Sequence, residues 1–310
     1  MDEVNGATIK PIDCHGTGRF MPANKKTYPV VRTVGLETPV GPFPQPQVEV
    51  NVEQLLSKAN RRLYRHGREY EVKIDLEPQS AQIISVYALS DSWMNERAFK
   101  MAYQMYLENS EDERDRIKEA NMARWEDFRT QSGFTGQFGV ANPVMYSGPD
   151  FASRVQLTAG EFATTFVVDS SGVSKAFTWG AASASRYSIL AEYDKAGNAQ
   201  SSPSTSTGDM PYDDLMADDS ATLGNLLQTS GNLPPYDAAG VNAGNPWVKV
   251  AELSAATTAQ KLSTGFFKAP CGYVLIAAGA NGDDIPVMRN IQLTAKAGAY
   301  KGVHAPSMLE

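Results

Sequence analysis

The sequence predicts an all-β fold, a single jelly roll (an antiparallel β-sandwich) with a helical insertion after the second strand and an extended N-terminal arm. Many short β-rich runs are separated by Gly, Asn, Asp, Ser and Pro, which is typical of sandwiches and barrels. Helical spacing of apolar residues is sustained within residues 92–130. A jelly roll tolerates such an insertion because its strand ends cluster at two edges, where loops can grow.

Residues 1–50 are expected to form the extended arm, and residues 51–310 the jelly-roll domain. The first fifty residues lack sustained periodicity, and residues 38–47 are dense in proline. Proline fixes its own backbone angle and removes a hydrogen-bond donor, which favours an extended segment on a surface. A short helical turn around Leu55 and Leu56 is expected to open the domain.

The first two core strands are predicted at residues 70–76 and 81–89. In the first, Tyr70, Val72, Ile74 and Leu76 alternate with charged residues. Such alternation indicates one buried and one solvent-exposed face. The second run is also β-rich, so the two form a hairpin-like pair.

Two helices are predicted after these strands. Residues 93–107 carry methionine, alanine and aromatic side chains at helical spacing, with Ser90, Asp91 or Ser92 as the N-cap. A second helix starts at Ser110, whose spacing to Glu113 matches a capping box, and runs to about residue 125.

The remainder returns to β-rich runs and one long loop. Strands are expected at residues 154–158, 161–168, 173–179, 186–193, 247–253, 263–268, 273–277 and 285–295. Residues 198–245 are rich in Ser, Thr, Gly and Asp. A loop of this length in a compact domain is usually functional or part of an interface.

Composition narrows the class of protein. The chain has 310 residues, of which 42% are hydrophobic and 20% charged, close to globular averages. No apolar run approaches the roughly 20 residues that span a bilayer, and the start does not resemble a signal peptide. We therefore expect no membrane insertion. The two cysteines, Cys14 and Cys271, give no framework of bridges and fit a reducing compartment.

No motif predicts catalysis, and we expect no enzyme and no catalytic residue. The three histidines, His15, His66 and His304, are far apart and have no metal-ligand spacing. Cys14 and His15 are adjacent, whereas catalytic Cys/His partners normally meet through the fold. No Walker sequence or nucleophile elbow is present.

Charge is distributed unevenly along the chain. The net charge of -7 argues against a protein that binds nucleic acid over its whole surface. Two stretches are basic and lack acids, however, and their cations could contact phosphates. The candidate nucleic-acid-binding residues are Arg19, Lys25, Lys26, Lys58, Arg61, Arg62, Arg65 and Arg68. The alternative is a salt-bridged surface between subunits or against the helical insertion.

The long loop is the candidate metal site. Asp213, Asp214, Asp218 and Asp219 could supply oxygen ligands to calcium at subunit contacts, although their order does not match an EF-hand. The alternative is a solvated acidic loop. No other cofactor is expected.

Four phrases carry a family resemblance. NRRLYR, EYEVKIDL, ISVYAL and FKMAYQMYLENSEDERDRIKEANMARWEDFR, within residues 55–129, resemble capsid (coat) proteins of small icosahedral viruses with circular single-stranded DNA genomes. The resemblance implies a structural protein of the virion that self-assembles into an icosahedral shell around viral nucleic acid, namely single-stranded DNA. It also implies synthesis in the host cytoplasm, with the nucleus as a candidate place of assembly.

One departure from the family concerns the genome. Its members often begin with a long basic arm, whereas the first fifty residues here contain only five basic residues. Two other classes remain open. A carbohydrate- or receptor-binding β-sandwich, of the phage-tail or adhesin type, would line a groove with exposed Trp179, Trp247 and tyrosines. A glycan-acting hydrolase would need a carboxylate pair in a cleft, which no spacing indicates.

Overall fold

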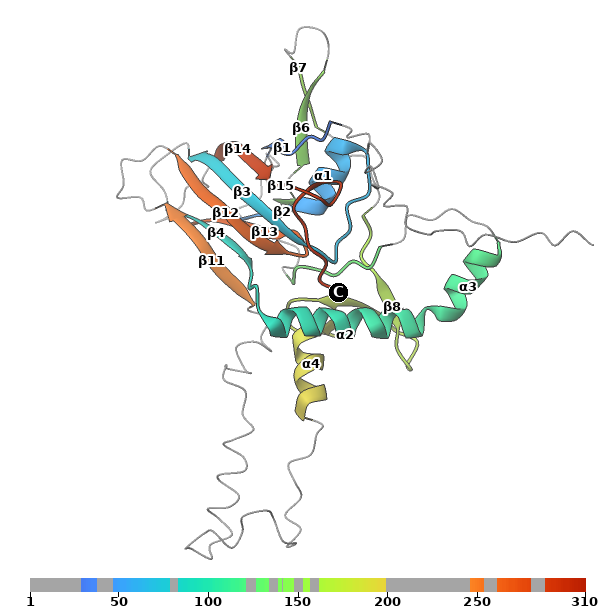
Figure 1. Ribbon diagram of the computed structural model, residues 1–310. Helices are drawn as coiled ribbons and strands as arrows, with labels where there is room; N and C mark the ends of the chain where they lie inside the picture. Colours follow the sequence, from blue (N-terminus) through green and yellow to red (C-terminus); the bar gives the residue numbers. More distant parts are fainter. Residues whose placement is uncertain are drawn as a thin grey trace, which may run out of the picture.

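The computed structural model is an antiparallel β-sandwich with few helices (Figure 1). It describes residues 29–37, 47–78, 83–120, 127–133, 139–140, 142–147, 153–156, 162–198, 246–253, 261–279 and 288–310. None of the helices in these ranges is long and apolar enough to cross a membrane.

Two large sheets form the sandwich. The first has the order β12 (Leu262–Pro270), β3 (Glu69–Pro78), β14 (Met288–Ala295), β1 (Thr33–Glu37), β6 (Asn142–Ser147) and β7 (Ser153–Gln156). The second has the order β11 (Trp247–Leu253), β4 (Ile83–Leu89), β13 (Tyr273–Gly279), β2 (Gln47–Asn51) and β5 (Gly139–Val140). Neighbouring strands in both sheets are antiparallel, except that β2 and β5 pair in parallel.

The chain passes repeatedly between the two sheets. The strands β1, β2, β3 and β4 lie in the first, second, first and second sheet, and β11, β12, β13 and β14 in the second, first, second and first. Strands from the two ends of the chain therefore alternate within each sheet, as where β14 lies between β1 and β3. The sandwich can close only when both ends have folded together.

The range expected to be an arm contains two core strands, so that expectation is wrong for residues 33–37 and 47–50. The strand β1 pairs with β14 and β6, and β2 pairs with β13 and β5. Val34 and Val50 are buried in the core. The helices after β4 consequently follow the fourth strand rather than the second.

The alternation predicted in residues 70–76 is confirmed. Tyr70, Val72, Ile74 and Leu76 are fully buried. They belong to one apolar cluster with side chains of the facing sheet, including Val86 of β4 and Ile276 of β13. Burial of each such side chain stabilises the fold by about 1.5–3 kcal/mol relative to its exposure.

Helix α1 (Val52–Asn60) joins β2 to β3, and α2 (Trp93–Asn109) follows β4. The prediction of a helix at 93–107 is confirmed, and its N-cap is Ser92, whose Oγ accepts a hydrogen bond from the backbone N–H of Asn95 at 3.3 Å. Helix α3 (Glu111–Glu119) begins after Ser110, but the expected capping box is absent. The Ser110 hydroxyl donates instead to the Tyr106 carbonyl at 2.6 Å, because it sits at the end of α2.

A second apolar cluster lies between α2 and a three-stranded sheet. That sheet has the order β10 (Arg186–Ser188), β9 (Ser174–Thr178) and β8 (Phe166–Val168). Phe99 of α2 stacks on Trp179, with ring centroids 6.2 Å apart and planes 5° from parallel. Both rings are fully buried, so this contact holds α2 against the small sheet.

The expected strand at 186–193 ends early. Its second part belongs to helix α4 (Ile189–Asn198). Ile189 and Leu190 are buried and Tyr193 packs against the same cluster. This spacing fits one face of a helix as well as it fits a short strand.

Near the C-terminus, β15 (Ala297–Gly298) and β16 (Gly302–Val303) form a small hairpin.

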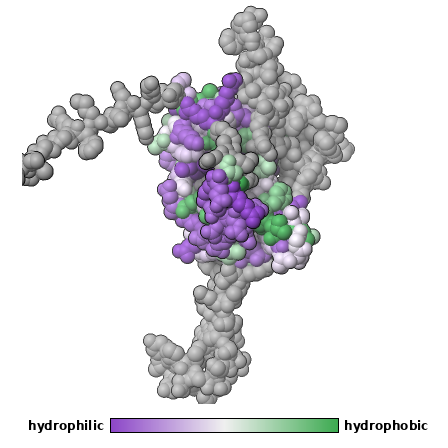
Figure 2. Space-filling model, turned by 90° about the vertical axis from the view of Figure 1, so that its right-hand side faces the viewer, coloured by the Kyte–Doolittle hydropathy of each residue, from purple (hydrophilic) through white to green (hydrophobic). Residues whose placement is uncertain are grey.

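Helix α3 projects from the body of the protein (Figure 1), and none of its residues is buried. Its first turn is acidic and its last turn basic. Seen from the side on which it projects, the described surface is mostly hydrophilic, with small hydrophobic areas (Figure 2).

Candidate functional site

The basic run predicted from the sequence lies on the connection from α1 to β3. Arg61 follows the end of α1 with a left-handed backbone (φ 52°). Its side chain is exposed, whereas Arg62 is partly exposed. The Nζ atom of Lys58 lies 5.6 Å from the centroid of the Phe162 ring, and burial lowers the pKa of Lys58.

Arg65 and Arg68 differ in what they contact. The Arg65 side chain is 53% exposed, and its Nη1 lies 3.7 Å from Oδ1 of Asp127. Arg68 donates from Nη1 to the Ala305 carbonyl at 2.7 Å, and its guanidinium carbon lies 3.6 Å from the Tyr300 ring centroid. Arg68 therefore fastens the C-terminal segment to the start of β3.

Positive charge accumulates around this run. The pKa of Lys301 is lowered first by burial and then by repulsion from Arg65 and Arg68. We call the surface formed by Arg61, Arg62, Arg65 and Lys301 the basic surface. Arg19, Lys25 and Lys26 lie outside the described residues, as do Asp213, Asp214, Asp218 and Asp219. Within the described ranges, no group of three or more His, Cys, Asp or Glu is arranged to hold a metal ion.

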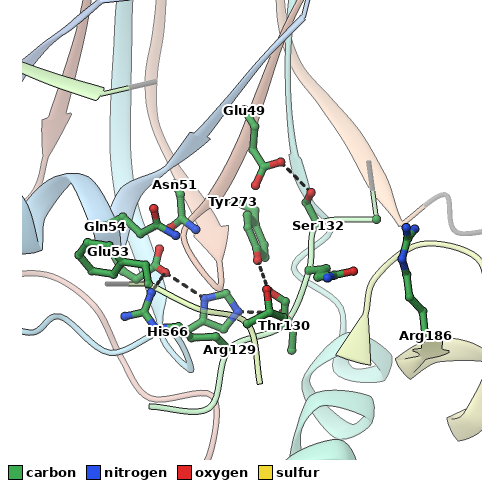
Figure 3. Close-up of a pocket in the computed structure, with 14 residues that line it drawn as sticks. Glu49, Asn51, Glu53, Gln54, His66, Arg129, Thr130, Ser132, Arg186 and Tyr273 are labelled. Atoms are coloured by element: carbon green, nitrogen blue, oxygen red, sulfur yellow. Dashed lines mark hydrogen bonds and ion pairs between the residues drawn. The ribbon is translucent and has the colours of Figure 1, made fainter. Parts of the chain in front are cut away.

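A polar cavity of about 450 Å³ lies beside the connection that carries the basic run (Figure 3). Its walls come from β2, α1, β13, the segment of residues 129–133 and the small sheet. Glu49, Glu53 and His66 line it together with Arg129.

A buried charge cluster borders this cavity and consists of Glu53, His66, Asp127 and Arg129. The Glu53 side chain is 0% exposed, and its Oε1 lies 3.0 Å from Arg129 Nη1 and 3.3 Å from His66 Nδ1. Asp127 Oδ2 lies 3.3 Å from Arg129 Nη2 and accepts the backbone N–H of His66 at 2.9 Å. The cluster thus ties α1 and the basic run to the segment after α3.

Thr130 fixes the other side of the His66 ring (Figure 3). Its Oγ1 lies 2.8 Å from His66 Nε2 and accepts a hydrogen bond from Trp179 Nε1 at 3.0 Å. The Tyr273 hydroxyl donates to the Thr130 carbonyl at 2.5 Å. Both ring nitrogens of His66 therefore have partners, and the ring is held in one orientation.

Burial raises the pKa of two carboxyls near the cavity. It is the main cause that raises the pKa of Glu49, whose Oε2 accepts a hydrogen bond from Ser132 at 2.8 Å. Burial likewise raises the pKa of Asp127, against the opposing attraction of His66 and Arg129. These groups are costly to ionise inside the protein, as expected for carboxyls removed from water.

The ion pairs of this cluster join separate elements of the fold. Glu49 and Glu53, which are four residues apart in the sequence, line one cavity. Glu53 is nevertheless sealed from solvent and engaged by Arg129 and His66.

The tryptophans expected to line an exposed groove do not do so. Trp179 is fully buried, and Trp247 is partly buried against the α2 cluster. The exposed indole within the described ranges is Trp93, at 56%. The carbohydrate-binding groove proposed around Trp179 and Trp247 is therefore absent from the described surface.

Comparison with protein-family models, curated proteins and solved structures finds no match to this chain.

Proposed function

We propose that this chain is a structural capsid subunit, a single jelly roll that self-assembles into an icosahedral shell and encloses viral nucleic acid. The observation that carries the proposal is the strand order. Four consecutive strands of each sheet, counted from one edge, run β12-β3-β14-β1 and β11-β4-β13-β2. Eight antiparallel strands exchanged in this way between two sheets are the expected arrangement of a jelly roll.

The segments outside these eight strands also support the proposal of a jelly-roll capsid subunit. The connection between β4 and β11 contains α2, α3, the small sheet and α4. It leaves the pairing of β4 with β11 intact. A helical insertion of this kind agrees with the resemblance of residues 55–129 to capsid proteins of small circular single-stranded DNA viruses.

The basic surface is the proposed contact with the genome. Arg61 is exposed and Arg65 is half-exposed, and the charges of Arg62 and Arg65 act on nearby Lys301. Cations that neutralise phosphates bind nucleic acid with an affinity that falls as salt rises. This role needs no catalytic group, and we propose that the protein is not an enzyme.

Electron microscopy of the purified full-length protein tests the assembly. We expect closed shells of uniform diameter. Persistent monomers across a range of salt, pH and calcium concentration would contradict the proposal, and would favour a β-sandwich binding module instead.

A triple variant tests the genome contact. Replacing Arg61, Arg62 and Arg65 by Ala is expected to lower the nucleic acid recovered per shell more than it lowers the yield of shells. For binding to a single strand, each lost phosphate contact should reduce the slope of log affinity against log salt by about 0.7. The matched control replaces Arg97 on α2, Lys249 on β11 and Lys261 just before β12, which are all exposed. Equal losses of shells and nucleic acid in the triple variant would assign these arginines to folding or to subunit contacts.

A further inference from the structure

A second cavity lies next to the basic surface. It has a volume of about 520 Å³ and is lined by the basic run, α2, α3 and the C-terminal segment. Arg65, Gly67 and Arg68 line it, whereas His66 lines the polar cavity described above. We call it the basic-aromatic cavity. Pockets of roughly 300–1,000 Å³ hold small molecules or groups of similar size.

The charge of this cavity is positive. Three arginines line it, Arg65, Arg68 and Arg114. The acid among its lining residues is Asp127, which is also engaged by Arg129. The Nε of Arg114 is buried and has no hydrogen-bond partner within the described residues. Guanidinium groups match the geometry of phosphate oxygens, so such a cavity is suited to an anionic phosphate.

Aromatic rings also line this cavity. Tyr103 and Tyr106 from α2 line it with Phe128. The Tyr103 ring centroid is 5.6 Å from that of Phe128, and Tyr106 is 5.3 Å from the same ring. Phe128 and Tyr106 are buried, whereas Tyr103 is partly exposed. Among these three rings, the one that remains partly accessible to a ligand is thus Tyr103, and it packs against Phe128.

Phosphate-binding cations beside an aromatic ring favour one ligand class. A nucleotide carries both a phosphate and a flat base, and bases stack on aromatic side chains in proteins that bind single strands. A duplex would keep its bases stacked within the helix. Inorganic phosphate would use the arginines and leave Tyr103 without a role.

From this geometry we propose that the basic-aromatic cavity binds one unpaired nucleotide of the enclosed strand, with its base on Tyr103 and its phosphate at Arg65 and Arg114. The inference rests on the proposed function, because the strand is the one enclosed by the shell. It adds that single-stranded nucleic acid is preferred, and that the contact includes a base as well as the phosphate backbone.

The test compares two single strands of equal length and charge, an oligothymidine and an abasic strand. Binding of each to the full-length protein is measured by fluorescence anisotropy. We expect the wild-type protein to bind oligothymidine about tenfold more tightly than the abasic strand, the size of one stacking contact. Tyr103→Ala should abolish this preference, and Tyr103→Phe should retain it.

Three further measurements distinguish the role of the arginine from that of the ring, and a bound strand from a free nucleotide. Arg114→Gln should weaken binding of both strands and leave their ratio unchanged. Phe166→Ala, which removes a 56% exposed aromatic ring outside the cavity, should change neither. Free thymidine monophosphate at moderate concentration should not displace the strand. Displacement by it would overturn the proposal in favour of a site for free nucleotides.

The outcomes distinguish this inference from the function on which it rests. Equal affinity for the two strands, or a preference that survives Tyr103→Ala, overturns the nucleotide cavity and leaves the shell proposal standing. Failure of the wild-type protein to bind either strand overturns the nucleotide cavity together with the proposed genome contact. Urea unfolding of each variant establishes that all are folded under the binding conditions.

Discussion

The two cavities on either side of residues 65–68 use charge in different ways. In the buried charge cluster, Glu53 and Arg129 are paired out of reach of solvent. In the basic-aromatic cavity, Arg65 is half-exposed and lines the same cavity as the partly exposed ring of Tyr103. Adjacent residues of one connection therefore serve stability on one side and, in our proposal, recognition on the other.

Because of this difference, the net charge of the chain does not describe the local charge at either cavity. The total of -7 includes carboxylates such as Glu53, which is paired with Arg129 inside the fold. The basic surface instead presents its cations to solvent. Burial separates the two roles, because a buried pair is costly to break whereas an exposed pair contributes little.

The largest expected effect comes from breaking the buried side. Glu53→Ala leaves Arg129 without its 3.0 Å partner and should lower the free energy of unfolding by about 3–5 kcal/mol. Urea unfolding measures this loss of unfolding free energy. On the exposed side, Arg65→Ala should cost less than about 1 kcal/mol. Similar losses for the two variants would mean that the comparison is mistaken.

The next effect concerns pH. Because the pKa of Glu49 is raised by burial, the folded state binds this proton more tightly than the unfolded state. Its contribution to stability is present below the ordinary glutamate pKa of about 4.3 and is lost as pH rises through the raised value. Glu49→Gln should therefore match the wild type near pH 4 and have a higher unfolding free energy than the wild type at pH 7. Urea unfolding at the two pH values measures the difference.

An exposed carboxyl provides the control of opposite sign. The hydrogen bond from Lys249, at 2.5 Å, lowers the pKa of Glu252. Its contribution is present above the ordinary pKa and lost as pH falls through the lowered value. Glu252→Gln should therefore reduce stability at neutral pH and not at acid pH. If Glu49→Gln and Glu252→Gln changed the unfolding free energy at neutral pH in the same direction, the directions assigned to the two pKa shifts would be contradicted.

The smallest expected effect sharpens the role of the polar network around His66. Tyr273→Phe removes the hydroxyl that donates to the Thr130 carbonyl and should cost about 0.5–1.5 kcal/mol in urea unfolding. Tyr103→Phe, on the basic-aromatic side, should change stability by less than about 0.5 kcal/mol. A loss for Tyr103→Phe as large as that for Tyr273→Phe would show that Tyr103 belongs to the structural side.

The part of the fold that could be predicted is the part with sustained periodicity. Four alternating buried residues identify β3, and the seventeen residues of α2 give several helical turns. The strands β1 and β2 have five residues each and flank a proline-rich stretch. Each brings only two buried apolar residues to the core, too few to distinguish alternation from chance.

Of the candidate sites, too, only one could be predicted from the sequence. The basic run is visible in the sequence because its cations are neighbours along the chain. The buried cluster is not, because Glu53, His66 and Arg129 meet only after the sandwich has brought α1 against the segment following α3. His66 in particular looks isolated in the sequence, yet both of its ring nitrogens have partners. In the sequence, Tyr103 belongs to an apolar helix face. Only the structure shows that it lines one cavity with Arg65 and Arg114.

Sedimentation velocity of the purified full-length protein, recorded at 260 and 280 nm, tests the central claim most directly. The account predicts one fast, uniform boundary of assembled shells, in which absorbance at 260 nm reports nucleic acid that sediments with the protein and resists nuclease. A slow boundary of monomers without nucleic acid, unchanged by salt, pH or calcium, would contradict it.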